Sequence, residues 1–141
     1  MSFESLKDVF WPAIAVAAVA YFALGAIWYI PQVMGTMWAR AGGIDQPEEQ
    51  SVNPFNFVAT LVAYFVSGVA TAMIAVSTGT DTAAEGVVLG LVVGIGYAFT
   101  AAAVTAIYDK KPDPVGWWLI NGIFNVAGLV VMGVIIGAWT G

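Results

Sequence analysis

Hydroxyl, amide and indole side chains recur at helical spacing inside the apolar stretches of this sequence. In an α-helix, positions i, i+4, i+7 and i+11 share one face, so residues at this spacing point the same way. Three stretches fit this template well, and a fourth fits it weakly. The polar positions are, in chain order, Tyr21, Trp28, Tyr29, Gln32, Asn56, Thr60, Ser67, Thr71, Tyr97, Thr100, Asn121 and Asn125.

These polar positions allow two interpretations. They could line a hydrated path between helices for an ion or a small solute. They could instead hydrogen-bond to one another across helices, each pair contributing about 0.6 kcal/mol. Because none of these side chains ionises near neutral pH, we expect the second arrangement. Asn121 and Asn125 should then face protein and meet groups such as Thr60, Ser67 or Tyr29.

Composition excludes most catalytic and metal chemistry. The chain has no Cys and no His, which removes thiol nucleophiles, thiolate zinc sites, imidazole acid–base catalysis and histidine ligation of haem. We therefore expect no catalytic residue, no cofactor and no metal site. The net charge of −5 lacks the cationic surface that nucleic-acid binding requires, so we expect no such partner.

The acidic residues have structural explanations. Glu85 is the carboxylate nearest an apolar interior, and its spacing from Thr82 is that of a capping box, in which both side chains accept from backbone N–H groups. The acidic half of the long first loop contains Asp45, Glu48 and Glu49 without a calcium-binding pattern. We expect that half-loop to be solvated.

The elements that carry the polar positions must be membrane-spanning helices. Of the 141 residues, 60% are apolar or aromatic and 9% are charged, which is about a third of the charged fraction in a soluble domain. Apolar runs long enough to cross a bilayer predict four spans, at about 10–31, 54–77, 84–108 and 114–139. We expect one all-α domain, an integral membrane four-helix bundle.

Local signals mark where these helices start and stop. Capping residues followed by proline or by a capping-box glutamate precede the second, third and fourth spans. Pro31 lacks a backbone donor and should end the first span. The start signals are Asn53-Pro54, Thr82 with Glu85, and Asp113-Pro114.

The connections between spans predict packing and orientation. Loops two and three are short, so spans that follow one another should be antiparallel neighbours. The first half of loop one should lie at the membrane interface. Arg40, Lys110 and Lys111 lie on the side of loops one and three, against Lys7 alone on the opposite side. The positive-inside rule then places loops one and three in the cytoplasm and both termini outside.

Glycines form a separate pattern in the third and fourth spans. Gly86, Gly90 and Gly94 are four residues apart, as are Gly133 and Gly137. This spacing lets another helix backbone approach closely. The partner could be a neighbouring helix in the same bundle or a second copy of the chain, and the sequence leaves both open.

One segment carries a family resemblance. From Gly25 the chain reads Gly-Ala-x-Trp-Tyr-x-Pro, and Gly35 and Trp38 follow. This resembles the motif that closes the first helix in the DUF1761 family, which comprises small bacterial membrane proteins of unknown function, and the last span is also similar to that of the family. The resemblance implies a bacterial inner-membrane location and directs attention to Trp28 and Tyr29, without implying an activity.

Three functions fit these observations. We favour a non-catalytic structural or accessory protein that packs through its helices with copies of itself or with a membrane-protein partner. A small channel or carrier would use the polar positions as its path. A membrane enzyme would need a nucleophile or an acid–base group within the bilayer, and the sequence offers only tyrosines and hydroxyls there.

Overall fold

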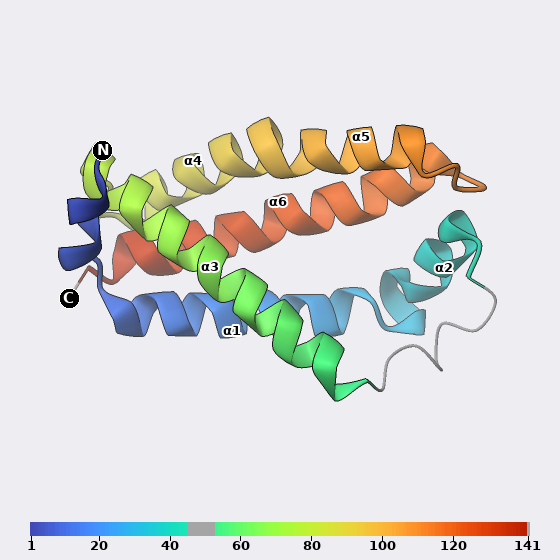
Figure 1. Ribbon diagram of the computed structural model, residues 1–141, viewed down its shortest axis with the longest axis horizontal. Coiled ribbons are helices and arrows are strands. Elements are labelled where there is room, and N and C mark those ends of the chain that lie inside the picture. Colours follow the sequence, from blue (N-terminus) through green and yellow to red (C-terminus); the bar gives the residue numbers. More distant parts are fainter. Residues whose placement is uncertain (45–52, 141) are drawn as a thin grey trace.

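The computed structural model describes residues 1–44 and 53–140, so Asp45, Glu48, Glu49 and Gly141 lie outside the described residues. Every regular element in these ranges is helical (Figure 1). The elements are η1 (Phe3–Lys7), α1 (Trp11–Trp28), η2 (Pro31–Gly35), α2 (Thr36–Gly42), α3 (Pro54–Thr78), α4 (Ala83–Val93), η4 (Gly94–Phe99), α5 (Thr100–Tyr108) and α6 (Pro114–Ala138).

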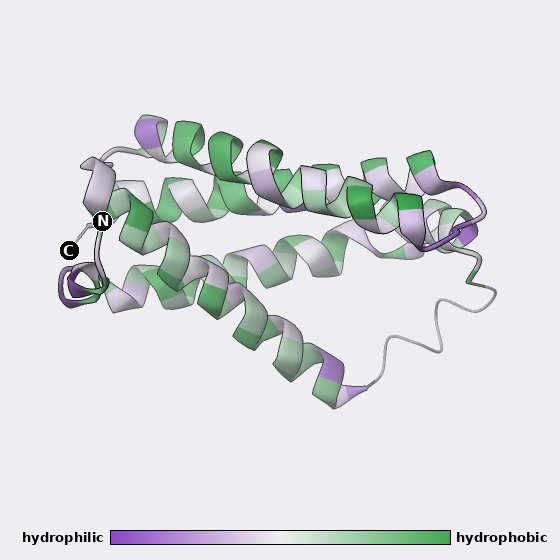
Figure 2. Ribbon diagram, turned by 45° about the horizontal axis from the view of Figure 1, so that its top comes forward, coloured by the Kyte–Doolittle hydropathy of each residue, from purple (hydrophilic) through white to green (hydrophobic). Residues whose placement is uncertain are grey.

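Four helices are long and apolar enough to cross a membrane, which is the number that the sequence predicts. They are Trp11–Trp28, Pro54–Thr78, Ala83–Tyr108 and Pro114–Ala138, the third being the continuous helix of α4, η4 and α5. Polar residues gather at the two ends of the bundle, where the loops lie (Figure 2). The protein is therefore an all-α, multi-pass membrane protein.

The helices start where the capping signals predict. Asn53 accepts a hydrogen bond from the N–H of Phe55 at 3.0 Å, and Asp113 accepts one from the N–H of Gly116 at 3.0 Å. Thr82 accepts from the N–H of Glu85 at 3.2 Å. The Glu85 carboxylate accepts in return from the N–H of Asp81 at 3.0 Å, one residue before the donor in a standard capping box.

Helix α6 is the centre of the bundle. It packs along α4 on one face and along α1 on another, and α3 crosses α1 obliquely (Figure 1). The third and fourth spans are antiparallel neighbours, as predicted, but the prediction is wrong for the second and third spans, although their loop is also short. Helices α3 and α4 are close only near their turn at Gly79, because α3 places Gly68 against Ile14 of α1 instead.

Four glycines bring the backbones of α4 and α6 together, and we call Gly86, Gly90, Gly133 and Gly137 the glycine seam. A Cβ on Gly90 would lie 2.5 Å from the Cα of Val130, and one on Gly86 would overlap the carbonyl of Gly133. Gly94 continues this line, since a Cβ there would lie 3.0 Å from Val126 Cα. The predicted glycine faces thus serve packing within the chain.

The first half of loop one is helical, which the sequence analysis did not predict. After Tyr29 the chain makes one extended residue, Ile30, and resumes as η2 and α2. Helix α2 packs against the start of α6, where the N–H of Asp113 donates to the carbonyl of Ala41 at 3.1 Å. Loop one is thereby attached to loop three at this end of the bundle.

Substitution in the glycine seam should destabilise the protein. Gly90→Ala is expected to lower the free energy of unfolding by about 1 to 3 kcal/mol, because the new methyl group would force two backbones apart. Gly96→Ala is the matched control, since nothing lies within 4 Å of a Cβ placed there. Thermal melts in mild detergent should show a lower transition for Gly90→Ala alone, and equal transitions would contradict this packing.

Candidate functional site

Two tyrosine–asparagine hydrogen bonds join α1 to α6, and we call Tyr21, Tyr29, Asn121 and Asn125 the polar seam. The Tyr29 hydroxyl donates to Asn121 Oδ1 at 2.6 Å. The Tyr21 hydroxyl donates to Asn125 Oδ1 at 2.5 Å. Both asparagines therefore face protein, as predicted, and Tyr29 is among the partners that the sequence analysis named.

The second group of each asparagine amide is also bonded. Asn121 Nδ2 donates to the carbonyl of Trp117 at 2.8 Å, and Asn125 Nδ2 donates to the carbonyl of Asn121 at 2.9 Å. Each amide thus bonds through its oxygen to α1 and through its nitrogen to its own helix. This arrangement fixes both the rotation and the height of α6 relative to α1.

Small residues make room for the large side chains of the polar seam. The Tyr21 ring lies over Gly128, where a Cβ would be 2.5 Å from Tyr21 Cζ. On α1, a Cβ on Gly25 would lie 3.1 Å from Phe124 Cζ. Each helix therefore places a glycine opposite an aromatic ring of the other, and this lets the hydroxyls reach the amides.

Aromatic rings enclose the polar seam. Tyr64 of α3 stacks on Tyr21 with 3.9 Å between ring centroids, while Phe124 meets Tyr21 and Tyr29 edge-on at 5.5 and 5.1 Å. Tyr21 and Phe124 are only 3% and 2% exposed. This apolar covering strengthens the hydrogen bonds inside it, because the local dielectric constant is low.

The Trp-Tyr-x-Pro motif forms the turn that ends α1. Ile30 is extended before Pro31, as residues before proline tend to be. The N–H of Gly35 then donates back to the carbonyl of Ile30 at 2.9 Å, and a Cβ on Gly35 would lie 2.8 Å from Ile30 C. Only glycine lets the chain return so closely, and the return brings Trp38 edge-on to Tyr29 at 5.5 Å.

One polar atom beside the polar seam is not satisfied. The indole Nε1 of Trp28 is buried and has no hydrogen-bond partner among the described residues. The Trp28 ring lies 6.3 Å from that of Phe124. A buried N–H without an acceptor is uncommon in native structures.

The remaining polar positions do not join the polar seam. On α3, Thr60 donates to the carbonyl of Asn56 at 2.7 Å, and Thr71 donates to that of Ser67 at 2.8 Å. Such bonds within one helix are the usual alternative for a hydroxyl. Exposed at the surface are Gln32, Asn56, Tyr97 and Thr100.

Tyr64, which stacks on Tyr21 beside the polar seam, is not among the residues predicted from the sequence. It lies four residues after Thr60, so it shares the helical face of the predicted polar positions on the same span. By spacing alone, Ala63 fits the polar face of this span as well as Tyr64 does. Only the contact of Tyr64 with Tyr21 of α1 distinguishes the two residues. An aromatic hydroxyl at this spacing was the available signal.

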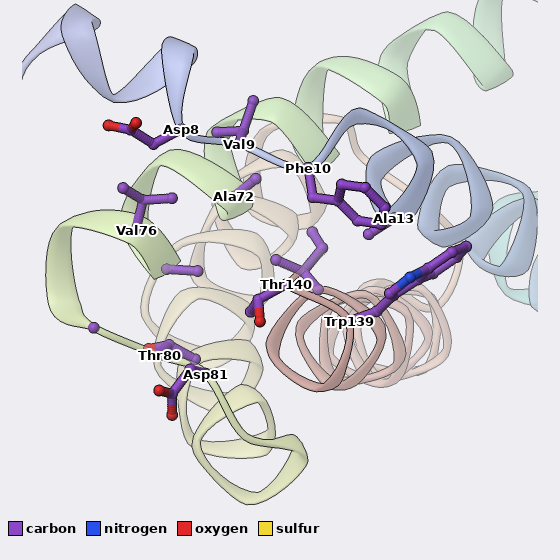
Figure 3. Close-up of a pocket in the computed structure, with 13 residues that line it drawn as sticks. Asp8, Val9, Phe10, Ala13, Ala72, Val76, Thr80, Asp81, Trp139 and Thr140 are labelled. Carbon is purple, nitrogen blue, oxygen red and sulfur yellow. The ribbon is translucent and has the colours of Figure 1, made fainter.

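An open cavity of about 200 Å³ lies at the end of the bundle that holds both termini. Phe10 and Trp139 meet edge-on beside it, with 5.3 Å between ring centroids. Figure 3 shows the carboxylates of Asp8 and Asp81 turned away from its centre. Within residues 1–44 and 53–140, no group of three acidic side chains could hold a metal ion.

Comparison with known proteins identifies a family. Residues 12–137 match the family model described as a protein of unknown function, DUF1761. The chain has no significant match among curated proteins or among solved structures. The matched region begins with α1, includes the turn at Pro31 and reaches the last turn of α6. Over nearly its whole length, the chain belongs to the DUF1761 family.

Proposed function

We propose that this protein is a non-catalytic, helix-packing protein of the bacterial inner membrane that associates with copies of itself or with another membrane protein. The supporting observation is the polar seam. Its hydroxyl and amide groups bond to one another and to helix carbonyls, as groups do when they hold helices together. None of them ionises near neutral pH, so none is suited to acid–base catalysis.

Replacement of Asn125 tests this proposal directly. Asn125→Leu should lower stability by about 0.5 to 2 kcal/mol, because it removes the Tyr21 hydrogen bond from a buried interface. Asn56→Leu is the matched control, since that amide is exposed near the start of α3. Thermal melts in detergent measure the loss of stability, and liposome assays of proton and potassium flux measure transport.

The two readouts separate structure from transport. A lower melting transition for Asn125→Leu, with wild-type liposomes as tight as empty ones, supports the packing function. The opposite result would be flux through wild-type liposomes that Asn125→Leu abolishes without changing the melting transition. That result would replace the packing function with the channel or carrier function. The indole N–H of Trp28, which has no partner among the described residues, favours this second candidate, because it could bond to a water molecule or a solute in a path.

We propose that a partner binds to the third span, on the side away from the glycine seam. We call Val92, Gly96, Tyr97, Thr100 and Val104 the outer face. Val92, Tyr97 and Val104 are 62%, 75% and 55% exposed, and nothing lies within 4 Å of a Cβ on Gly96. Gly96 and Thr100 are small residues four positions apart, a spacing that favours helix association in membranes.

Disulfide cross-linking tests the outer face. The natural chain has no Cys, so Gly96→Cys introduces a single thiol. If copies associate through the outer face, oxidation in membranes should give a covalent dimer. Val19→Cys is the control, because Val19 is 59% exposed near the middle of α1. Dimers from Val19→Cys and not from Gly96→Cys would contradict the assignment.

We infer the orientation from the basic residues. Three of the four basic residues, Arg40, Lys110 and Lys111, lie in loops one and three, at the same end of the bundle. This distribution supports a cytoplasmic position for these two loops. In intact cells, an impermeant thiol reagent should therefore label Ser2→Cys but not Lys110→Cys. Labelling of Lys110→Cys alone would mean that the orientation is reversed.

A further inference from the structure

A second cavity, also open to the surface and of about 440 Å³, lies where α2 meets the start of α6. We call it the loop-end cavity. Its size falls in the range of small-ligand sites, about 300 to 1,000 Å³. The backbone bond from Asp113 to Ala41 attaches its two walls to each other. Close contact between Gly43 and Pro112, where a Cβ would lie 2.9 Å from Pro112 Cγ, adds a second attachment.

Two side chains of opposite charge line the loop-end cavity. Arg40 comes from α2 and Asp113 from the start of α6. No ion pair between described residues joins them, although Lys111 and Asp109 form one nearby at 3.4 Å. Asp113 uses one carboxylate oxygen to cap α6 through the N–H of Gly116. The cavity thus offers a guanidinium group and a carboxylate oxygen at separate points.

The remaining walls and the position of the cavity favour a lipid. Met37, Ala41 and Ile120 give it an apolar surface. It lies at the end of the bundle where α6 begins, and Trp117 is in the first turn of that helix. The Lys111 ammonium group lies 5.3 Å from the centre of the Trp117 ring. Tryptophan and lysine at a span end mark the headgroup region of a bilayer.

We propose that the loop-end cavity binds the headgroup of a phosphatidylethanolamine molecule. Arg40 binds the phosphate, since guanidinium groups match phosphate oxygens in geometry and charge. Asp113 accepts hydrogen bonds from the primary ammonium group, and the glycerol and upper acyl chain lie along Met37 and Ile120. Phosphatidylcholine has no N–H to donate, and phosphatidylglycerol has no cation to meet Asp113. This proposal is independent of the proposed packing function.

Native mass spectrometry of the detergent-solubilised protein, titrated with each lipid, tests the proposal. The wild type should bind phosphatidylethanolamine about tenfold more tightly than phosphatidylcholine or phosphatidylglycerol, as expected for one charge-assisted hydrogen bond. Asp113→Asn should lose this preference while keeping the helix cap, because asparagine caps as well as aspartate. Arg40→Gln should weaken the binding of all three lipids.

The controls make each outcome decisive. Lys7→Gln removes the same charge from an exposed ion pair at the other end of the bundle and should leave the preference intact. Equal binding of the three lipids by the wild type would overturn the proposal, as would an equal loss in Lys7→Gln. Tight binding of soluble phosphoethanolamine alone would overturn the lipid assignment in favour of a free headgroup. Arg40 is exposed, so Arg40→Gln keeps the test valid even if Asp113→Asn fails to fold.

Discussion

A hydroxyl or amide group inside a bilayer has no water to bond to, and leaving it unpaired costs several kcal/mol. This constraint explains how α1 and α6 are arranged. Tyr21 and Tyr29 supply two donors on α1, and Asn125 and Asn121 supply the matching acceptors on α6. Because both bonds must form at once, α1 has one rotation and one height against α6. The other elements then pack around this pair.

Helix α6 satisfies a second constraint on another face. The glycine seam places its backbone against that of α4, where side chains of any size would collide. Gly128 serves the first face in the same way by admitting the Tyr21 ring. In a bilayer, apolar side chains gain little by leaving lipid, so close backbone contact and paired polar groups must hold helices together. The sequence of α6 provides one of these on each face.

Much of this architecture is predictable because it depends on short-range signals. The span limits follow from runs of apolar residues, and the helix starts follow from Asn53, Thr82 and Asp113, whose side chains bond within three residues. The inward face of α6 follows from the cost of an unpaired amide. The pairing of Tyr21 with Asn125 and the oblique course of α3 depend on contacts between distant segments. No local pattern in one sequence specifies them.

Some polar positions that the helical spacing places on an inward face are exposed in the structure, and they show where that spacing fails as a guide. Gln32 was assigned to the face of Tyr21 by extending a 3.6-residue period, but α1 ends at Trp28 and the chain turns before Gln32. Tyr97 lies within the wider turn of η4 and Thr100 directly follows it, and this turn rotates residues relative to a regular α-helix. In this segment the Trp118 indole donates to the carbonyl of Phe99 at 2.9 Å, and the Phe99 ring covers Gly122. Since that contact holds the Phe99 side of the third span against α6, Tyr97 on the other side must point away from the bundle.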